Sequence, residues 1–196
     1  MARTKVFDEH LILEKAMELF WQKGYNATSA QDLVDNLGIS RSSMYDTYGD
    51  KHSLFLKALE LYRRERIDPV IKGLTTADDI EAYVRSIFKT VKAEAVEPAE
   101  PTGCFMVNSA VELATVDSDV RTIANAIMRD TEEALYNAIQ KGQDEGIFTT
   151  AFPARALGRF VLNSLNGFRV TMKFDASERM FDDIVDVCLS VLKGRS

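Results

Sequence analysis

Two short helices separated by a glycine turn form the most constraining pattern in this chain, within residues 29–51. Ser29 is placed to cap the first helix, which Gly38 stops, and Ser40 is placed to cap the second, which Gly49 ends. Such a pair is the unit that lays its second helix in the major groove of DNA. This stretch therefore constrains the fold and the function together.

The rest of the chain is also predicted to be helical. A helix over 8–23 precedes the pair, and a long helix, capped by Asp50, runs from Lys51 to about Arg66 with its apolar residues on one face. No alternating pattern typical of strands reaches a useful length. Further helices are expected at 77–95, 103–114, 118–144, 153–173 and 177–192.

These elements predict an all-α fold with about nine helices. A three-helix, helix-turn-helix head over residues 1–50 is joined by the long helix to a larger helical body, so that the second domain covers residues 51–196. Two domains suit a chain of 196 residues, which can bury a sizeable core.

The net charge of −6 comes from residues 67–196. Residues 1–66, which include the head and most of the long helix, hold 10 basic and 10 acidic side chains, whereas residues 67–196 hold 14 and 20. A neutral N-terminal segment binds phosphate if its cations share one face, and we expect a modest affinity that weakens with salt. The acidic composition therefore does not exclude a nucleic-acid partner.

An ordered set of residues across the head is similar to a known family. The set comprises Ala16, Leu19, Phe20, Gly24, Tyr25, Thr28, Ser29, Asp32, Leu33, Leu37, Gly38, Ile39, Ser40, Met44, Tyr45, Tyr48, Gly49, Asp50, Lys51, Leu54 and Phe55. With this spacing the head resembles the tetracycline-repressor (TetR) family of bacterial transcriptional regulators. Residues 103–108, with Glu112, Leu113 and Ala114, more loosely resemble a stretch found in one branch of that family.

The resemblance implies a one-component regulator, most often a repressor, whose homodimer binds a palindromic operator in double-stranded DNA. It implies that the body holds a small-molecule pocket and that the last two helices pair across the dimer. An inducer would then separate the heads and release the DNA.

The polar side chains of the second helix of the pair are candidates for contact with bases. Arg41 can donate two hydrogen bonds to guanine, while Ser42 and Ser43 are short enough to allow close approach. Asp46 can accept from a cytosine amino group or pair with Arg41, and we favour the pair. Thr47 lies on the same outward face.

Other contacts are assigned to the DNA backbone. The resemblance places Thr28, Tyr45, Thr47 and Lys51 at positions that contact phosphate, and Lys51 also lies at a helix start, which suits an anion. Tyr45 can instead be a core aromatic residue, as Tyr48 is expected to be, and Lys51 can be a solvated one. Arg3 and Lys5 form a basic arm that either reaches the DNA or remains a free tail.

The body offers candidates for sensing a ligand. Cys104 begins a predicted helix, where the thiol pKa falls, and some members of the branch that it resembles respond to oxidants or electrophiles through a cysteine here. Lys173 is a candidate basic partner. The alternative is an inert buried thiol. Large apolar residues that line a pocket or simply fill the core include Phe105, Met128, Phe168 and Met172.

Two apolar stripes near the C-terminus are candidates for the dimer contact. The stripes comprise Leu157, Phe160, Val161, Ser164 and Phe168 on one helix and Phe181, Ile184, Val185 and Cys188 on the next. Two such helices from each subunit can form a four-helix bundle. Packing within one subunit is the competing interpretation.

Motifs of other functional classes are missing from the sequence. His10 and His52 are the only histidines, the two cysteines lack metal-site spacing, and no phosphate loop or nucleophile elbow occurs, so no metal, cofactor or catalytic residue is expected. No signal peptide and no apolar run near the roughly 18 residues of a membrane span is found, which predicts a cytoplasmic protein. A helical protein-interaction module without specific DNA binding and, least favoured, an all-helical enzyme remain alternatives.

Overall fold

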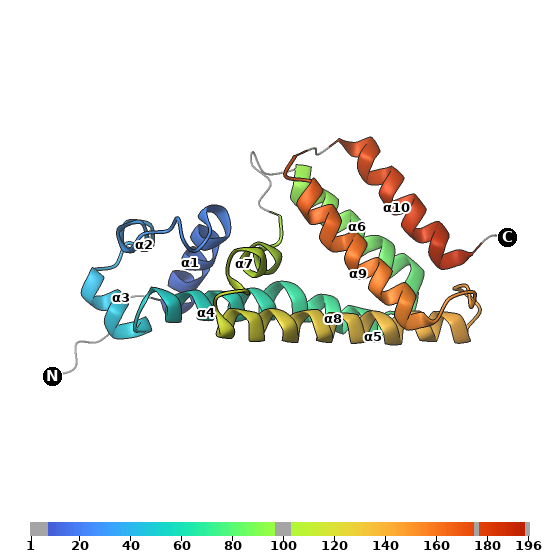
Figure 1. The fold of residues 1–196 in the computed structure, drawn as a ribbon, viewed down its shortest axis with the longest axis horizontal. Coiled ribbons are helices and arrows are strands. Elements are labelled where there is room, and N and C mark those ends of the chain that lie inside the picture. Colours follow the sequence, from blue (N-terminus) through green and yellow to red (C-terminus); the bar gives the residue numbers. More distant parts are fainter. Residues whose placement is uncertain (1–7, 97–102, 175–176, 195–196) are drawn as a thin grey trace.

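The computed structural model describes residues 8–96, 103–174 and 177–194, and within these ranges the chain folds into helices and turns without strands. The all-α prediction is therefore confirmed (Figure 1). The elements are α1 (Glu9–Lys23), α2 (Ala30–Leu37), α3 (Arg41–Tyr48), α4 (Lys51–Tyr62), the π-helical segment η1 (Arg63–Ile67), α5 (Asp68–Thr76), α6 (Ile80–Val96), α7 (Phe105–Leu113), α8 (Ser118–Asp144), α9 (Ala154–Thr171) and α10 (Glu178–Lys193).

Side-chain caps fix where the helices of the head begin. The Ser29 hydroxyl accepts a hydrogen bond from the Asp32 N–H (3.0 Å) and the Asp32 carboxylate accepts one from the Ser29 N–H (2.8 Å), a capping box at the start of α2. The Ser40 and Asp50 side chains cap α3 and α4 by accepting from the N–H groups of Ser43 and Ser53. Gly38 ends α2 in the left-handed region, with φ 66°. The caps expected at Ser29, Ser40 and Asp50 are confirmed.

The long helix continues beyond its expected end. The prediction that it stops near Arg66 is wrong, because α4, η1 and α5 follow one another without a break from residue 51 to residue 76. Pro69 lies in the first turn of α5, where its missing N–H costs little. Gly73 is in direct contact with the Tyr83 ring of α6, which leaves no room for a larger side chain. Both residues are thus accommodated inside the helical run.

Two hydrophobic cores are joined by α8. The N-terminal core combines α1, α2, α3 and α4 with α7, and the C-terminal core combines α5, α6, α9 and α10. The first half of α8 contributes Val120, Ala124 and Ile127 to the former, and its second half, from Ala134, contributes to the latter. Figure 1 shows α8 running alongside α4 and α5, with the head at one end and α6, α9 and α10 above the other.

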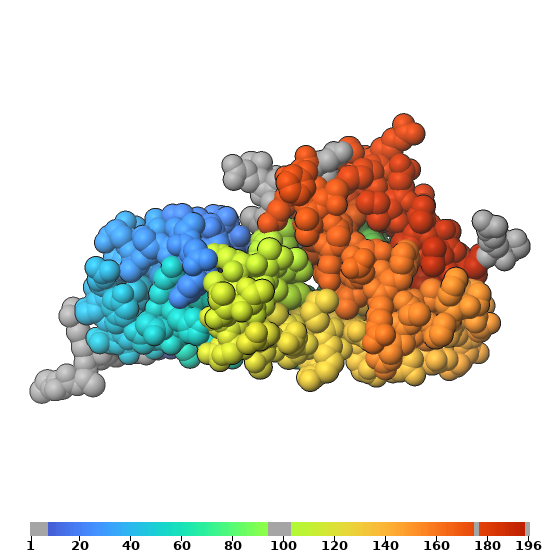
Figure 2. Space-filling view, viewed as in Figure 1, coloured from blue at the N-terminus to red at the C-terminus, as the bar shows by residue number. Residues whose placement is uncertain are grey.

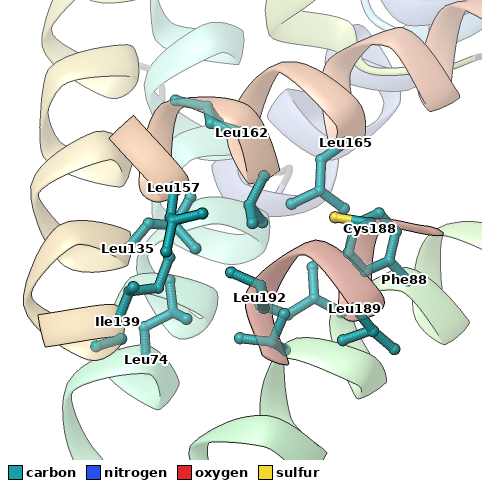
Figure 3. Packing of buried hydrophobic residues seen from close by; sticks show 14 of the residues in the cluster. Leu74, Phe88, Leu135, Ile139, Leu157, Leu162, Leu165, Cys188, Leu189 and Leu192 are labelled. Carbon is teal, nitrogen blue, oxygen red and sulfur yellow. The ribbon is translucent and has the colours of Figure 1, made fainter. Parts of the chain in front are cut away.

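The C-terminal core is built from leucine and aromatic side chains of five helices. Figure 3 shows Leu157 and Leu165 of α9 directed into the same core as Leu192 of α10. The Phe168 ring packs edge-on against Phe181, with 4.3 Å between ring centroids. Within the described residues, no helix is both long enough and apolar enough to cross a membrane.

Candidate nucleic-acid interface

One face of α3 is buried and the other is open to solvent. Met44 and Tyr48 enter the N-terminal core, and the Tyr48 hydroxyl donates to the Glu9 carbonyl oxygen at 3.2 Å. Burial raises the pKa of Tyr48 above its ordinary value. The interpretation of Tyr48 as a core residue is confirmed. The exposed face is formed by Arg41, Ser42, Tyr45 and Asp46, with Ser43 and Thr47 half-buried at its edges.

The start of α3 carries three hydroxyl groups in mutual contact. The Ser40 oxygen lies 3.0 Å from the Ser42 hydroxyl and 2.8 Å from the Ser43 hydroxyl, and it also accepts from the Ser43 N–H at 3.1 Å. Short side chains therefore leave the N-terminal end of α3 open to close approach, as groove entry requires.

The ion pair favoured between Arg41 and Asp46 does not form, and this expectation is corrected. Among the described residues neither side chain makes an ion pair, and both are exposed. Residues five apart on a helix lie on different sides of it, whereas three or four apart makes neighbours. The Arg41 guanidinium thus remains available to an external acceptor.

Lys51 lies at the first position of α4 and is held against an aromatic ring. Its ammonium nitrogen is 4.2 Å from the centroid of the Tyr25 ring, a cation–π contact. Burial lowers the pKa of Lys51, while Glu112 and Asp32 act in the opposite direction. A cation fixed in this way beside α3 presents its charge with little loss of side-chain freedom.

Thr28 is removed from the proposed DNA contacts. The resemblance implied a phosphate contact, but the side chain is 0% exposed, and its hydroxyl donates to the Gly24 carbonyl oxygen at 2.6 Å. The hydroxyl therefore closes the turn between α1 and α2 and does not reach solvent. The basic arm at Arg3 and Lys5 lies outside the described residues.

Contacts between the head and the body were not predicted from the sequence. The Glu112 carboxylate of α7 accepts hydrogen bonds from the backbone N–H groups of Tyr25 and Asn26 in the head, and next to the head His52 of α4 contacts Asp117 at 2.7 Å. Glu112 belongs to the stretch that resembles one family branch, which was the only available signal. Its partners are 86 and 87 residues away in sequence, so their proximity depends on the fold.

Cys104 is the N-cap residue of α7, and its thiol is buried. The sulfur lies 3.3 Å from the Tyr62 hydroxyl oxygen, inside the N-terminal core. Lys173, the candidate basic partner, donates to the Asn108 side-chain oxygen at 2.7 Å. An added Cβ at Gly103 would lie 2.7 Å from the Lys173 Cε, so this lysine does lie over the start of α7.

The apolar residues expected to line one pocket lie in different places, which corrects that expectation. Phe105 belongs to the N-terminal core, whereas Phe168 and Met172 belong to the C-terminal core. Met128 is 36% exposed on α8, where its sulfur accepts from Asn166 at 3.7 Å. Residue type and helical period do not say which core a side chain enters.

Most residues expected at the dimer contact fill the core of their own subunit. Leu157, Val161, Phe168, Phe181 and Cys188 are buried, and burial raises the pKa of the Cys188 thiol to about 11. These five are corrected to core residues, because the apolar stripe of each helix faces inward.

A smaller apolar surface remains on α9 and α10. Ser164 is half-buried, Ile184 and Val185 are partly buried against the core, and Phe160 is 39% exposed. The other exposed large apolar side chains on or next to these helices are Phe152, Val170, Phe174 and Val187. Phe160 is thus the only member of the predicted set with this degree of exposure among the described residues.

Two histidine groups in the described residues have the composition of a cation site. His10 with Glu14 and Glu65, and His52 with Asp117 and Asp119, each bring three potential ligand atoms within 4.8 Å. In both groups a carboxylate oxygen already lies within hydrogen-bonding distance of a ring nitrogen, 2.9 Å for His10 and 2.7 Å for His52. These hydrogen bonds account for both arrangements.

Comparison with known proteins gives the family. The model for bacterial regulatory proteins of the tetR family matches residues 12–58, and that for the tetracyclin repressor-like C-terminal domain matches residues 80–187. A relative from Bacillus subtilis (strain 168), the uncharacterized HTH-type transcriptional regulator YezE, is 33% identical over 193 residues. That match covers 98% of this chain and 100% of the relative.

Two further matches agree with this family. The HTH-type transcriptional repressor ComR of Escherichia coli (strain K12) is 27% identical, over 89% of this chain and 84% of its own. CifR, a cysteine-substituted TetR family regulator solved with 26-bp double-strand operator DNA, has the same fold, with a TM-score of 0.85. It is 22% identical in sequence, and the match covers 97% of this chain and 100% of the CifR chain. The chain belongs to the TetR family of bacterial regulatory proteins, and it is a transcriptional regulator rather than an enzyme.

Proposed function

We propose that this regulator is a repressor that binds a palindromic operator as a homodimer in the cytoplasm and leaves it when an inducer binds. The observation that carries the proposal is the open face of α3, where Arg41 is exposed and unpaired among the described residues, and the start of α4 adds the Lys51 cation held on the Tyr25 ring. The named activity of ComR as a repressor and the operator DNA bound to CifR support it.

The proposed contacts divide into base readout and backbone positioning. Arg41 donates to guanine in the major groove, with Ser42 and Ser43 allowing the helix end to approach and Asp46 available to a cytosine amino group. The hydroxyls of Tyr45 and Thr47, with the Lys51 ammonium, contact phosphate and fix the orientation of α3.

The proposed dimer pairs α9 and α10 with the same helices of a second copy. The exposed side chains of Phe160, Val170 and Val187 would be removed from water in this four-helix arrangement, and twofold symmetry would apply each contact twice. The operator palindrome follows from the same symmetry.

The proposed inducer response acts through α7. Alkylation of the Cys104 thiol by an electrophile, with loss of the thiol proton, would add atoms in a close-packed core beside Tyr62. The displaced residues would shift α7, which contacts the head. We expect Cys104→Ser to abolish release of DNA by an electrophile, and unchanged release would exclude Cys104 as the sensor.

Selection of bound sequences from random double-stranded DNA tests the function directly. We expect wild-type protein to enrich one palindrome and Arg41→Ala to enrich a set with relaxed preference at one base pair of each half-site. Enrichment of no sequence would favour the helical interaction module over the repressor.

A further inference from the structure

A carboxylate of the body holds the turn that joins the first two helices of the head. Glu112, in the last turn of α7, accepts from the Tyr25 N–H through one carboxylate oxygen (3.0 Å) and from the Asn26 N–H through the other (2.7 Å). Two consecutive backbone N–H groups therefore converge on one anion. Hydrogen bonds to an ionised acceptor are about twice as strong as those between neutral groups.

The backbone of the turn is shaped to fit this carboxylate. Gly24 has φ 80°, a conformation that favours glycine, and an added Cβ there would lie 2.9 Å from the nearer Glu112 oxygen. Glycine at position 24 thus lets the N–H groups of the next two residues face Glu112 without a side chain between them. Glu112 and its bond to the Tyr25 N–H are partly buried, so solvent screens this bond less than it would at an open surface.

A second contact holds the start of α4, next to the head, against the connection from α7 to α8. The His52 Nε2 of α4 lies 2.7 Å from an Asp117 carboxylate oxygen of that connection. Hydrogen bonds from the Val120 backbone and then from His52 lower the pKa of Asp117. Lys51, the residue before His52, packs on the ring of Tyr25, whose N–H donates to Glu112.

Two further contacts hold the N-terminal half of α7 against the rest of the body. Asn108 accepts from Lys173 just after α9, and Cys104 contacts Tyr62 of α4. Figure 2 shows the yellow-green atoms of this region lying directly against the blue atoms of the head. A single short helix therefore connects residues next to α9 with the turn before α2.

We infer that Glu112 is a positioning residue for operator binding, because it fixes the helix-turn-helix unit in orientation relative to the dimerising body. Two heads must meet half-sites at a set spacing, and a head that pivots on α4 alone would meet that spacing for only part of the time. This inference rests on the proposed function, since it assigns a role in binding a two-part operator.

Glu112→Gln is the informative variant because it keeps the size of the side chain. The glutamine carbonyl oxygen can accept from one of the two backbone N–H groups. The glutamine NH2 group then faces the second N–H, and two donors cannot form a hydrogen bond. Glu145→Gln, an exposed position at the far end of α8, is the matched control with the same change in charge. His52→Ala removes the second contact and gives an independent test if Glu112→Gln does not fold.

Amide hydrogen exchange in the free protein tests the contact itself. We expect faster exchange at Tyr25 and Asn26 in Glu112→Gln and no change in the control. Unchanged exchange would overturn the inference whether or not the protein binds DNA.

Operator binding at varied half-site spacing tests the positioning role. We expect Glu112→Gln to bind the natural spacing about tenfold more weakly, the equivalent of one charge-assisted hydrogen bond. Operators lengthened or shortened by one base pair should lose much less, so that the spacing preference falls. His52→Ala should reduce this preference in the same direction.

An equal loss at every spacing, with a lower unfolding temperature, would reduce Glu112 to a merely structural residue and overturn the inference. If the wild-type protein selects no operator, the proposed function is refuted, and so is the positioning role of Glu112. The exchange measurement distinguishes that result from a failure of the contact.

Discussion

Replacing Lys51 by glutamine removes one cation from the predicted phosphate contacts while leaving the length of the side chain almost unchanged. Lys51 begins α4, packs 4.2 Å from the centroid of the Tyr25 ring and is half-buried. Lys89, exposed on α6 in the body, is the matched control. The two variants make the same change in charge at opposite parts of the chain.

The expected magnitude follows from counterion release. Each phosphate neutralised on B-form DNA contributes about −0.9 to the slope of log K against log salt concentration. The proposed dimer presents Lys51 twice, so Lys51→Gln should make the slope less steep by about 1.8. Lys89→Gln should leave it unchanged, because that side chain lies away from the head.

Fluorescence anisotropy of a labelled operator over a series of salt concentrations measures this slope. The affinity of Lys51→Gln should fall evenly for related operators, since phosphate contacts carry no base information. An unchanged slope, or an equal change in both variants, would refute the assignment of Lys51 to the DNA backbone.

Three other predictions concern the capping box, the core thiol and the dimer. Hydrogen bonds from Lys23 and Ser29 hold the pKa of Asp32 well below its ordinary value, so the ionised Asp32 stabilises the fold above that ordinary pKa and this stabilisation is lost as the pH falls. Asp32→Asn should therefore flatten the decrease in unfolding temperature between about pH 5 and pH 2. The same curve in both proteins would contradict this. Burial raises the pKa of the Cys188 thiol to about 11, so at pH 8 the reactive thiolate is scarce and iodoacetamide should modify Cys188 only after unfolding, as mass spectrometry of the peptides would show; rapid labelling of Cys188 in the native protein would contradict this. Val187 is 60% exposed, so Val187→Asp should fold normally yet raise the dimer dissociation constant by roughly two orders of magnitude in analytical ultracentrifugation; an unaffected dimer would place the interface elsewhere.

The helices of the head could be predicted because their signals are local. Ser29 with Asp32, and Gly38 with its positive φ, act within one turn of the backbone, and the structure keeps them where the sequence placed them. The long helix was predicted too short because Pro69 and Gly73 normally weaken a helix, whereas here Pro69 lies in a first turn and Gly73 is covered by Tyr83.

The apolar stripes of α9 and α10 show a different limit. Helical spacing correctly placed Phe168 and Phe181 on apolar faces, yet such a face can meet its own subunit or another one. Both rings turned inward, while Val187, on the opposite side of α10, remained exposed. Periodicity does not distinguish these two partners.

The sequence by itself determined that this chain is helical, where the head helices begin, and which side of α3 carries Arg41, because capping and helical period depend on residues a few positions apart. Only the tertiary structure decided that Thr28 is enclosed, that Cys104 meets Tyr62, and that Glu112 binds the turn after α1. Those contacts join residues far apart along the chain, with the exception of Thr28, whose burial depends on the helices that close over it. Such contacts depend on how the helices pack on one another, which capping and helical spacing do not specify.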